Sequence, residues 1–213
     1  HACAACAARY NLGILYECCH QITDAVDVAD LDAIKALTAG VITATISGTE
    51  AQLDDLDTTA TDAITMTVSD VVDVAEFNVL DALTSSDISL HSITDAADNL
   101  GASGTAVAGY IAATTQDTDV PVTISDTPTI AELNAIAAET TGAVTATISG
   151  SHDALAALST AATDAITVTL TDEMSVAQFN TLDGKTSSNI TLDNTGGVQD
   201  AVANFIQVDE TAA

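Results

Sequence analysis

The stretch VITATISG, residues Val41–Gly48, decides the fold, because apolar and hydroxyl-bearing side chains alternate along it. Ile42, Ala44 and Ile46 are apolar, and the residues that follow them are Thr, Thr and Ser. Successive side chains of an extended strand point to opposite faces of the sheet. The stretch therefore predicts a half-buried strand with one apolar face and one face of hydroxyl groups.

The same pattern returns later in the chain as AVTATISG, residues Ala143–Gly150, at an offset of 102 positions (143 − 41). The longer segment from Ile22 to Ser92 aligns without gaps to Ile124–Asn194, and roughly half of the paired positions are identical. The chain is therefore an internal duplication.

Each long repeat contains shorter units, in which a β-branched strand leads through an Asp and a short spacer into an amphipathic helix. Val122–Ile136 (VTISDTPTIAELNAI) and Val168–Leu182 (VTLTDEMSVAQFNTL) are two such units. The predicted strands lie near Cys18–Thr23, Ile42–Ser47, Ala63–Ser69, Ile88–Leu90, Val122–Ser125, Val144–Ser149, Ala165–Thr171 and Ile190–Leu192. The predicted helices lie near Ala29–Leu37, Glu50–Leu56, Val74–Leu83, Thr94–Leu100, Ile130–Ala138, Asp153–Leu158, Val176–Leu182 and Val198–Phe205.

Strands that alternate with helices must run parallel, because a short hairpin cannot connect them. A doubly wound sheet would have strands that are apolar on both faces, whereas these strands are apolar on one face only. We therefore predict an α/β fold: an open right-handed solenoid of leucine-rich-repeat-like units of about 20–25 residues, with a one-sided parallel sheet. Its expected parts are a Cys-rich cap or assembly segment (1–21), a first long repeat (22–119) and a second long repeat (120–213) in one continuous solenoid.

Composition excludes several classes of function. The chain has 213 residues, 3 Lys and Arg against 31 Asp and Glu, and a formal net charge of −28. Three cationic side chains cannot neutralise a phosphate array, so we expect neither nucleic acid nor an anionic membrane as a partner. No stretch approaches the ~18 apolar residues that a membrane span needs. At 47% hydrophobic residues, the chain still has material for a core.

The exposed hydroxyl rows are the main candidate for a binding or assembly face. One interpretation is that Thr simply suits an exposed sheet surface. Another is lateral self-association, or docking onto a repetitive polymer such as a polysaccharide, and a third is ice binding through ordered water. The residues of this candidate face are Thr43, Thr45, Thr65, Thr67, Thr145, Thr147, Thr167 and Thr169.

An Asp follows the end of most predicted strands. Such a residue is typical of a helix cap, because its carboxylate accepts backbone N–H bonds at the positive end of the helix. Weak calcium binding is the competing interpretation, since hard cations prefer carboxylate oxygens. No calcium-loop motif is present, and no cofactor is required. The candidate residues are Asp24, Asp70, Asp126 and Asp172.

The cysteines gather in the first twenty residues, at Cys3, Cys6, Cys18 and Cys19. Ala7 stands where a c-type haem site needs His, and the adjacent pair 18–19 does not have zinc-finger spacing. We expect disulfides, within or between protomers, that hold the open end of the solenoid. Metal binding and free thiols are the alternatives.

No catalytic motif is present. His91 and His152 are not retained between the repeats, because Asp193 and Glu50 stand at the matching positions. We interpret both histidines as surface residues and expect no enzymatic activity.

Three stretches carry a resemblance to a known group of proteins: SDTPTIAELNAI (Ser125–Ile136), TDEMSVAQFNTLDGKTSSNITL (Thr171–Leu192) and VTATISG (Val144–Gly150). They resemble the tandem repeats of very large secreted and cell-surface proteins of marine cyanobacteria and proteobacteria. The resemblance covers about Ile22–Phe205 and implies an extracellular structural or adhesive role, commonly with type I-like secretion and sometimes with calcium. The Cys-rich N-terminus departs from that pattern.

Taken together, these features predict an extracellular or cell-surface structural repeat protein that self-assembles, as a subunit of a surface layer, sheath, fibre or adhesin. The expected partner is a second copy, in a homopolymer or head-to-tail assembly. The alternative is a module that binds polysaccharide or ice through its Thr and Ser face.

Overall fold

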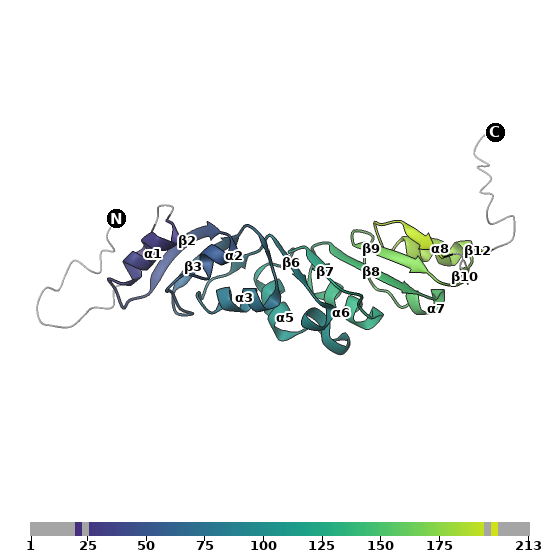
Figure 1. The fold of residues 1–213 in the computed structure, drawn as a ribbon, viewed down its shortest axis with the longest axis horizontal. Helices are drawn as coiled ribbons and strands as arrows, with labels where there is room; N and C mark the ends of the chain where they lie inside the picture. Colours follow the sequence, from purple (N-terminus) through teal and green to yellow (C-terminus); the bar gives the residue numbers. More distant parts are fainter. Residues whose placement is uncertain (1–19, 23–25, 194–196, 200–213) are drawn as a thin grey trace, which may run out of the picture. The chain divides into compact units, whose positions relative to one another are not determined.

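A computed structural model describes residues 20–22, 26–193 and 197–199, and it is an α/β structure with parallel sheets (Figure 1). The α/β class and the parallel strands predicted from the sequence are thereby confirmed. The chain divides into two compact units, His1–Ile93 with Thr115–Asp117, and Thr94–Thr114 with Thr118–Ala213. The sequence repeats were divided at 119/120, whereas residues Thr94–Thr114 already belong to the second compact unit.

The first unit is built on a sheet with the strand order β1-β2-β3-β5. Paired residues are 22, 20 and 22 positions apart, as in His20↔Ile42, Thr45↔Thr65 and Met66↔Ile88. A second parallel pair joins β4 to the start of β6. The elements are β1 (His20–Gln21), α1 (Val28–Lys35), β2 (Ile42–Gly48), α2 (Glu50–Leu53), β3 (Ala63–Val68), β4 (Val71–Val72), α3 (Val74–Asp81), β5 (Ile88–Ser89) and β6 (Ser92–Asp95), which runs into the second unit.

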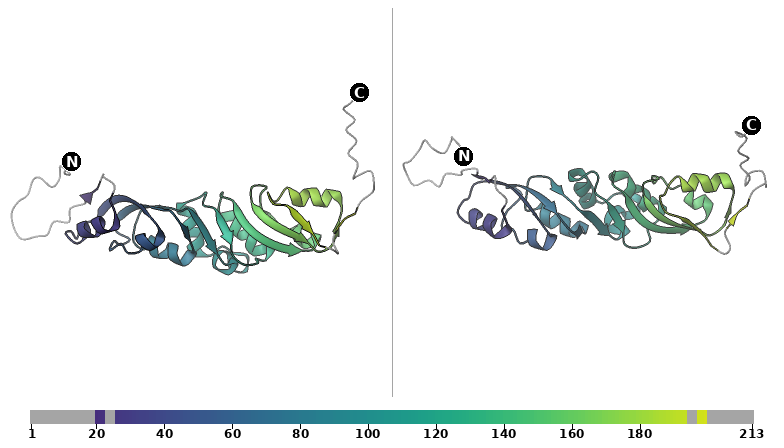
Figure 2. Two further views of the ribbon diagram at one scale, coloured as in Figure 1. Left: turned by 45° about the horizontal axis from the view of Figure 1, so that its top comes forward. Right: turned by 90° about the horizontal axis from the view of Figure 1, so that it is seen from above.

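The second unit, drawn in teal to yellow in Figure 2, repeats this plan. Its sheet has the strand order β11-β9-β8-β7-β6-β4, to which the first unit contributes β4, and β10-β12 form a separate pair. The offsets are again 22, 20 and 22, as in Val122↔Val144, Thr147↔Thr167 and Val168↔Ile190. Its further elements are α4 (Ala97–Gly101), the 3-10 helix η1 (Ala102–Gly104), α5 (Ala108–Gln116), β7 (Val122–Ile124), α6 (Ile130–Glu139), β8 (Val144–Gly150), α7 (His152–Leu155), β9 (Ala165–Leu170), β10 (Glu173–Met174), α8 (Val176–Asp183), β11 (Ile190–Leu192) and β12 (Gly197–Val198).

The core of each unit lies between one face of its strands and its helices. In β2 and β8 the side chains alternate between buried and exposed, with Ile42 and Val144 fully buried. Helix α2 packs on β2, and α6 and α7 pack on β8. The opposite face of these strands carries the hydroxyl side chains, so the predicted one-sided burial is confirmed for them.

Several of the helices begin where the sequence supplies a capping box. Asp73, Thr129 and Ser175 precede α3, α6 and α8, and each forms a capping box with the Glu or Gln three residues later. Helices α2 and α7 have only four residues each, so the longer helices predicted there are reduced to single turns.

Three predictions about elements were wrong or incomplete. The helix predicted over Thr94–Leu100 is confirmed from Ala97 onward as α4, but residues 92–95 form β6, because Ser92 and Ile93 pair with Val71 and Val72. Helix α5 was not predicted. Val198 belongs to a strand and not to a helix over Val198–Phe205, whose residues 200–205 lie outside the described part of the chain.

Candidate functional site

The predicted face of Thr side chains is exposed on both units. Thr43, Thr45, Thr65 and Thr67 are exposed in the first unit, and Thr145, Thr147 and Thr167 in the second, whereas Thr169 is half-buried. We call these eight side chains, with Ser47, Ser89, Ser149 and Thr191 in the same rows, the hydroxyl face. Each unit carries its own part of this face.

Parallel pairing brings these side chains together in rows. Ser47 lies opposite Thr67, which lies opposite Ser89, so one row crosses three strands of the first unit. In the second unit the matching row is Ser149–Thr169–Thr191. Neighbouring strands are about 4.8 Å apart, so each row presents hydroxyl groups at that repeat. The sequence predicted the hydroxyl face because strict alternation places the hydroxyl groups of every strand on the same side of the sheet.

The side chains that define the hydroxyl face are all Thr or Ser, although the chain has a net charge of −28. Asp117 reaches the edge of this face, where it accepts a hydrogen bond from the hydroxyl of Ser89 at 3.5 Å. Several other carboxylates of the first unit crowd around α2. Partial burial, followed by repulsion from Asp54, Glu76, Asp70 and Asp73, raises the pKa of Glu50 above its usual value. Repulsion between carboxylates therefore acts at α2 of the first unit.

Asp70, Asp126 and Asp172 serve as helix caps, but not for the helices that follow them. Each accepts, through Oδ1, the backbone N–H of the first residue of a helix earlier in the chain, namely Glu50, Ala97 and His152, at 2.7–2.8 Å. The cap prediction was therefore right about the chemistry and wrong about the helix. This contact spans 20 to 29 residues, so no local motif indicates it.

Calcium remains a prediction for these residues. Among the described residues, no group of three or more His, Cys, Asp and Glu side chains is placed to hold a metal ion. Asp24 lies outside the described residues, as do Cys3, Cys6, Cys18 and Cys19.

The outer edge of β5 is closed by side chains. Ile88 donates its backbone N–H to Gln116 Oε1 at 3.0 Å, and Leu90 donates to Asp117 Oδ2 at 2.6 Å. Gln116 in turn donates to Asp81 of α3. Unpaired strand edges invite pairing with other chains, and polar side chains that occupy the edge amides prevent it. The sequence did not indicate this closure.

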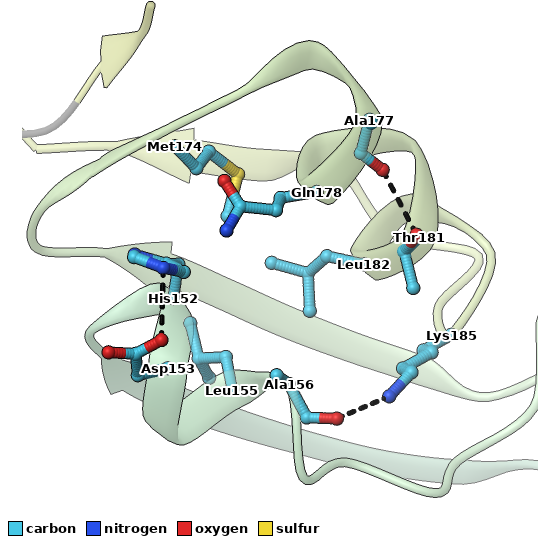
Figure 3. Close-up of a pocket in the computed structure, with 10 residues that line it drawn as sticks. All are labelled: His152, Asp153, Leu155, Ala156, Met174, Ala177, Gln178, Thr181, Leu182 and Lys185. Atoms are coloured by element: carbon cyan, nitrogen blue, oxygen red, sulfur yellow. Dashed lines mark hydrogen bonds and ion pairs between the residues drawn. The ribbon is translucent and has the colours of Figure 1, made fainter.

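A small pocket of about 260 Å³ lies between α7 and α8 in the second unit (Figure 3). Its floor is apolar, with Leu155, Met174 and Leu182. His152 stands at one end between two carboxylates, 3.1 Å from Asp172 and 3.0 Å from Asp153. Lys185 stands at the other end and donates to the carbonyls of Ala156 and Leu158.

The polar groups of this pocket are engaged with one another or with the backbone. Both imidazole nitrogens of His152 face carboxylates, and Thr181 donates its hydroxyl to the carbonyl of Ala177. Among the described residues that line the pocket, no hydroxyl or thiol therefore lies against the imidazole as a nucleophile would. His91 is exposed.

No helix among the described residues combines the length and the apolar character needed to cross a membrane. Comparison of the chain with models of known families, with curated proteins and with solved structures found no match.

Proposed function

We propose that this chain is an extracellular structural repeat protein, built as an open right-handed solenoid of α/β units, whose copies assemble into a surface layer, sheath, fibre or adhesin. The repeated offset of 20 to 22 residues between paired strands supports the solenoid, because each turn then adds one strand to the sheet. The resemblance to tandem repeats of large bacterial surface proteins supports the location.

The observation that carries this proposal is the face of Thr and Ser side chains on a chain of net charge −28. Two copies that meet through carboxylate-rich surfaces repel each other, and the repulsion costs several kcal/mol when like charges are juxtaposed. Copies that meet through the rows of the hydroxyl face bring Thr and Ser side chains together instead, with Asp117 at the edge beside Ser89. The rows on two copies can also interdigitate or share water, because both have the same strand repeat.

Sedimentation velocity and negative-stain microscopy test the proposal, at low and high salt, with and without calcium. We expect assemblies that grow with protein concentration and with salt, because salt screens the repulsion between copies. Dispersed monomers under every condition would overturn the proposal.

Charged variants of the face locate the contact. Thr45→Asp and Thr147→Asp place a carboxylate on the exposed strand surface and should shift the assembly to higher concentration by at least about tenfold. Ala51→Asp and Ala154→Asp are the matched controls, because they add the same charge at exposed positions in the first turns of α2 and α7. The controls should assemble normally. If the face variants and the control variants assemble at the same protein concentration, the contact lies on another surface.

A second candidate function is favoured by the three-strand rows Ser47–Thr67–Ser89 and Ser149–Thr169–Thr191. A regular array of hydroxyl groups fits a repetitive polysaccharide or an ice surface. A glycan array and a thermal-hysteresis assay test these ligands. Thr67→Val and Thr169→Val remove the central hydroxyl group of each row with little change of shape, so they should abolish any signal. Blank results with the unmodified protein would remove this candidate.

A further inference from the structure

We propose that copies of this chain join end to end by parallel pairing of β12 of one copy with β1 of the next. This inference rests on the proposed self-assembly and names the two strand edges that form the junction. It follows from the internal duplication, because the chain already contains one junction of this kind.

The internal junction joins β6 and β7, which are neighbours in the sheet. Strand β6 belongs to the first long repeat of the sequence, and β7 opens the second. Ser125 donates its backbone N–H to the carbonyl of Asp95 at 2.9 Å. Asp126 accepts the N–H of Ala97 at 2.8 Å. The end of one repeat is therefore compatible with the start of the next.

Strand β1 is the counterpart of β7. His20 pairs with Ile42 as Val122 pairs with Val144, and the two pairs are 102 positions apart. Strand β1 is thus the start of a repeat with no preceding strand among the described residues.

Strand β12 is the counterpart of β6. It pairs with β10, Glu173↔Gly197, as β6 pairs with β4, Val71↔Ser92. The offset is 24 in the first pair and 21 in the second, so the connection to β12 is three residues longer (24 − 21). Strand β12 is thus the end of a repeat with no following strand among the described residues.

The backbone directions of both strands suit the junction. Ile22 donates its N–H to Thr43 of β2, so the N–H and C=O of Gln21 point to the outer edge. Gln199 donates its N–H to Met174 of β10, so the same groups of Val198 point outward. Gln21 is exposed and Val198 is half-buried. In the junction, Gln21 of one copy donates its N–H to the carbonyl of Val198 of another.

This contact joins two different surfaces, so it does not close on itself in a pair. Heterologous contacts of this kind produce rings or open filaments. The edge of β5 shows that the chain closes an edge that is not paired, with Gln116 and Asp117. No described side chain closes β1 or β12 in that way.

Proline variants test the junction. Gln21→Pro and Val198→Pro remove an outward N–H and keep the inward hydrogen bonds of each strand. Gln21→Ala and Val198→Ala are the matched controls, because they alter the side chain and keep the N–H. We expect the proline variants to sediment at least about tenfold less assembled material than the controls, with unchanged circular dichroism. Gln21→Pro added to unmodified protein should also shorten its filaments, because it retains a working β12.

Hydrogen exchange gives a readout without substitution. The amide N–H groups of Gln21 and Val198 should exchange more slowly in the assembled than in the dispersed protein. Folded proline variants that assemble like the controls, or unchanged exchange at both amides, would overturn the junction while the proposed assembly stands. An unmodified protein that never assembles would instead overturn the proposed function.

Discussion

Asp62 and Asp164 hold the same position in the two repeats and differ in two partners, Lys35 and the hydroxyl of Thr59, which both donate to Asp62 only. Both are buried, and both accept the N–H of the residue that starts the preceding strand, Ile42 or Val144, at 3.0 and 2.9 Å. Only Asp62 also meets Lys35, at 2.7 and 2.9 Å. Ala137 stands where a second Lys would be. The carboxylate is thus the constant part of this turn, and the cation is an addition.

The pKa of Asp62 gives this turn a defined pH dependence. Burial raises the pKa, but hydrogen bonds from Lys35, Ile42 and Thr59 outweigh it and hold the pKa below its usual value. A carboxyl group with a lowered pKa in the folded state stabilises it above the usual pKa, about 4, and this contribution is lost as the pH falls through the folded value.

We predict that Asp62→Ala lowers the free energy of unfolding by about 2–4 kcal/mol at neutral pH, because it leaves a half-buried cation and two amides unpaired. Lys35→Met should cost less, about 1–3 kcal/mol, since Asp164 shows that the carboxylate tolerates the absence of a cation. Urea unfolding measures both, and the loss for Asp62→Ala should shrink at acid pH. A larger loss for Lys35→Met than for Asp62→Ala would contradict this assignment.

A lysine added at the position that matches Lys35 extends this prediction to the second repeat. Ala137→Lys introduces the missing ammonium group in the last turns of α6, where a cation also meets the negative end of the helix. It should raise the free energy of unfolding by about 0.5–1 kcal/mol. Asp164→Asn in the same background is the control and should remove the gain.

Glu50 is a site of repulsion that one substitution can relieve. Its raised pKa means that the charged form is disfavoured in the folded state. Glu50→Gln should therefore raise the free energy of unfolding at neutral pH, by about 0.2–0.5 kcal/mol for the contact with Asp54 four residues later. The gain should disappear below the usual pKa of 4.5, because Glu50 is then protonated in both states. A gain that persists at acid pH would exclude a charge effect.

At the scale of elements, one Thr in each repeat closes the turn that precedes a strand. Thr84 accepts the N–H of Ile64 at 2.9 Å and donates to its carbonyl at 2.6 Å, and it is buried. Thr186 does the same for Ile166, at 3.0 and 2.7 Å. These bonds connect the turn before β5 to the beginning of β3, and the turn before β11 to the beginning of β9, ahead of the first paired residues of those strands.

We predict that Thr84→Val and Thr186→Val each lower the free energy of unfolding by about 1–3 kcal/mol, because a buried N–H and C=O lose their partner without a change in volume. Thr65→Val is the matched control and should have little effect, because its hydroxyl faces solvent. Thermal unfolding compares the three. Equal effects at Thr65 and Thr84 would mean that the loss reflects strand propensity and not the hydrogen bonds.

The elements that the sequence predicted are those with a clear period. Strands such as β2 and β8 alternate strictly, and α6 has apolar residues at helical spacing. Strand β4 has only two residues, too few for a period to appear. Helix α5 (AGYIAATTQ) is composed of small and β-branched residues around one buried Tyr110, so no stripe marks it. Short and weakly patterned elements depend on their tertiary partners, which the local sequence does not contain.

The hydroxyl face was predicted for the same reason, since period-two alternation places its side chains on one surface. The side chains that accept hydrogen bonds from the edge strand and from the helix N-termini were not predicted. Gln116 meets Ile88 across 28 residues, and Asp70 meets Glu50 across 20. Such contacts between successive turns of the chain become visible only once the register is known.

For the whole molecule, the balance of charge sets the response to ions. A chain with 31 acidic and 3 basic side chains is destabilised by its own repulsion, and salt screens that repulsion over a distance of about 10 Å at 0.1 M. We therefore predict that the unfolding temperature rises steadily with NaCl. An unfolding temperature that does not change with NaCl would contradict the prediction that repulsion dominates.

Calcium and magnesium separate this screening from a specific site. Asp70, Asp126 and Asp172 each commit an oxygen to a backbone N–H, and Asp172 commits the other to His152. A calcium ion would need six to eight oxygen ligands, so it would have to displace these bonds. We expect CaCl₂ and MgCl₂ at equal concentration to raise the unfolding temperature equally. A rise with calcium at concentrations where magnesium has no effect would instead identify a calcium site, and the variants Asp70→Asn, Asp126→Asn and Asp172→Asn would locate it.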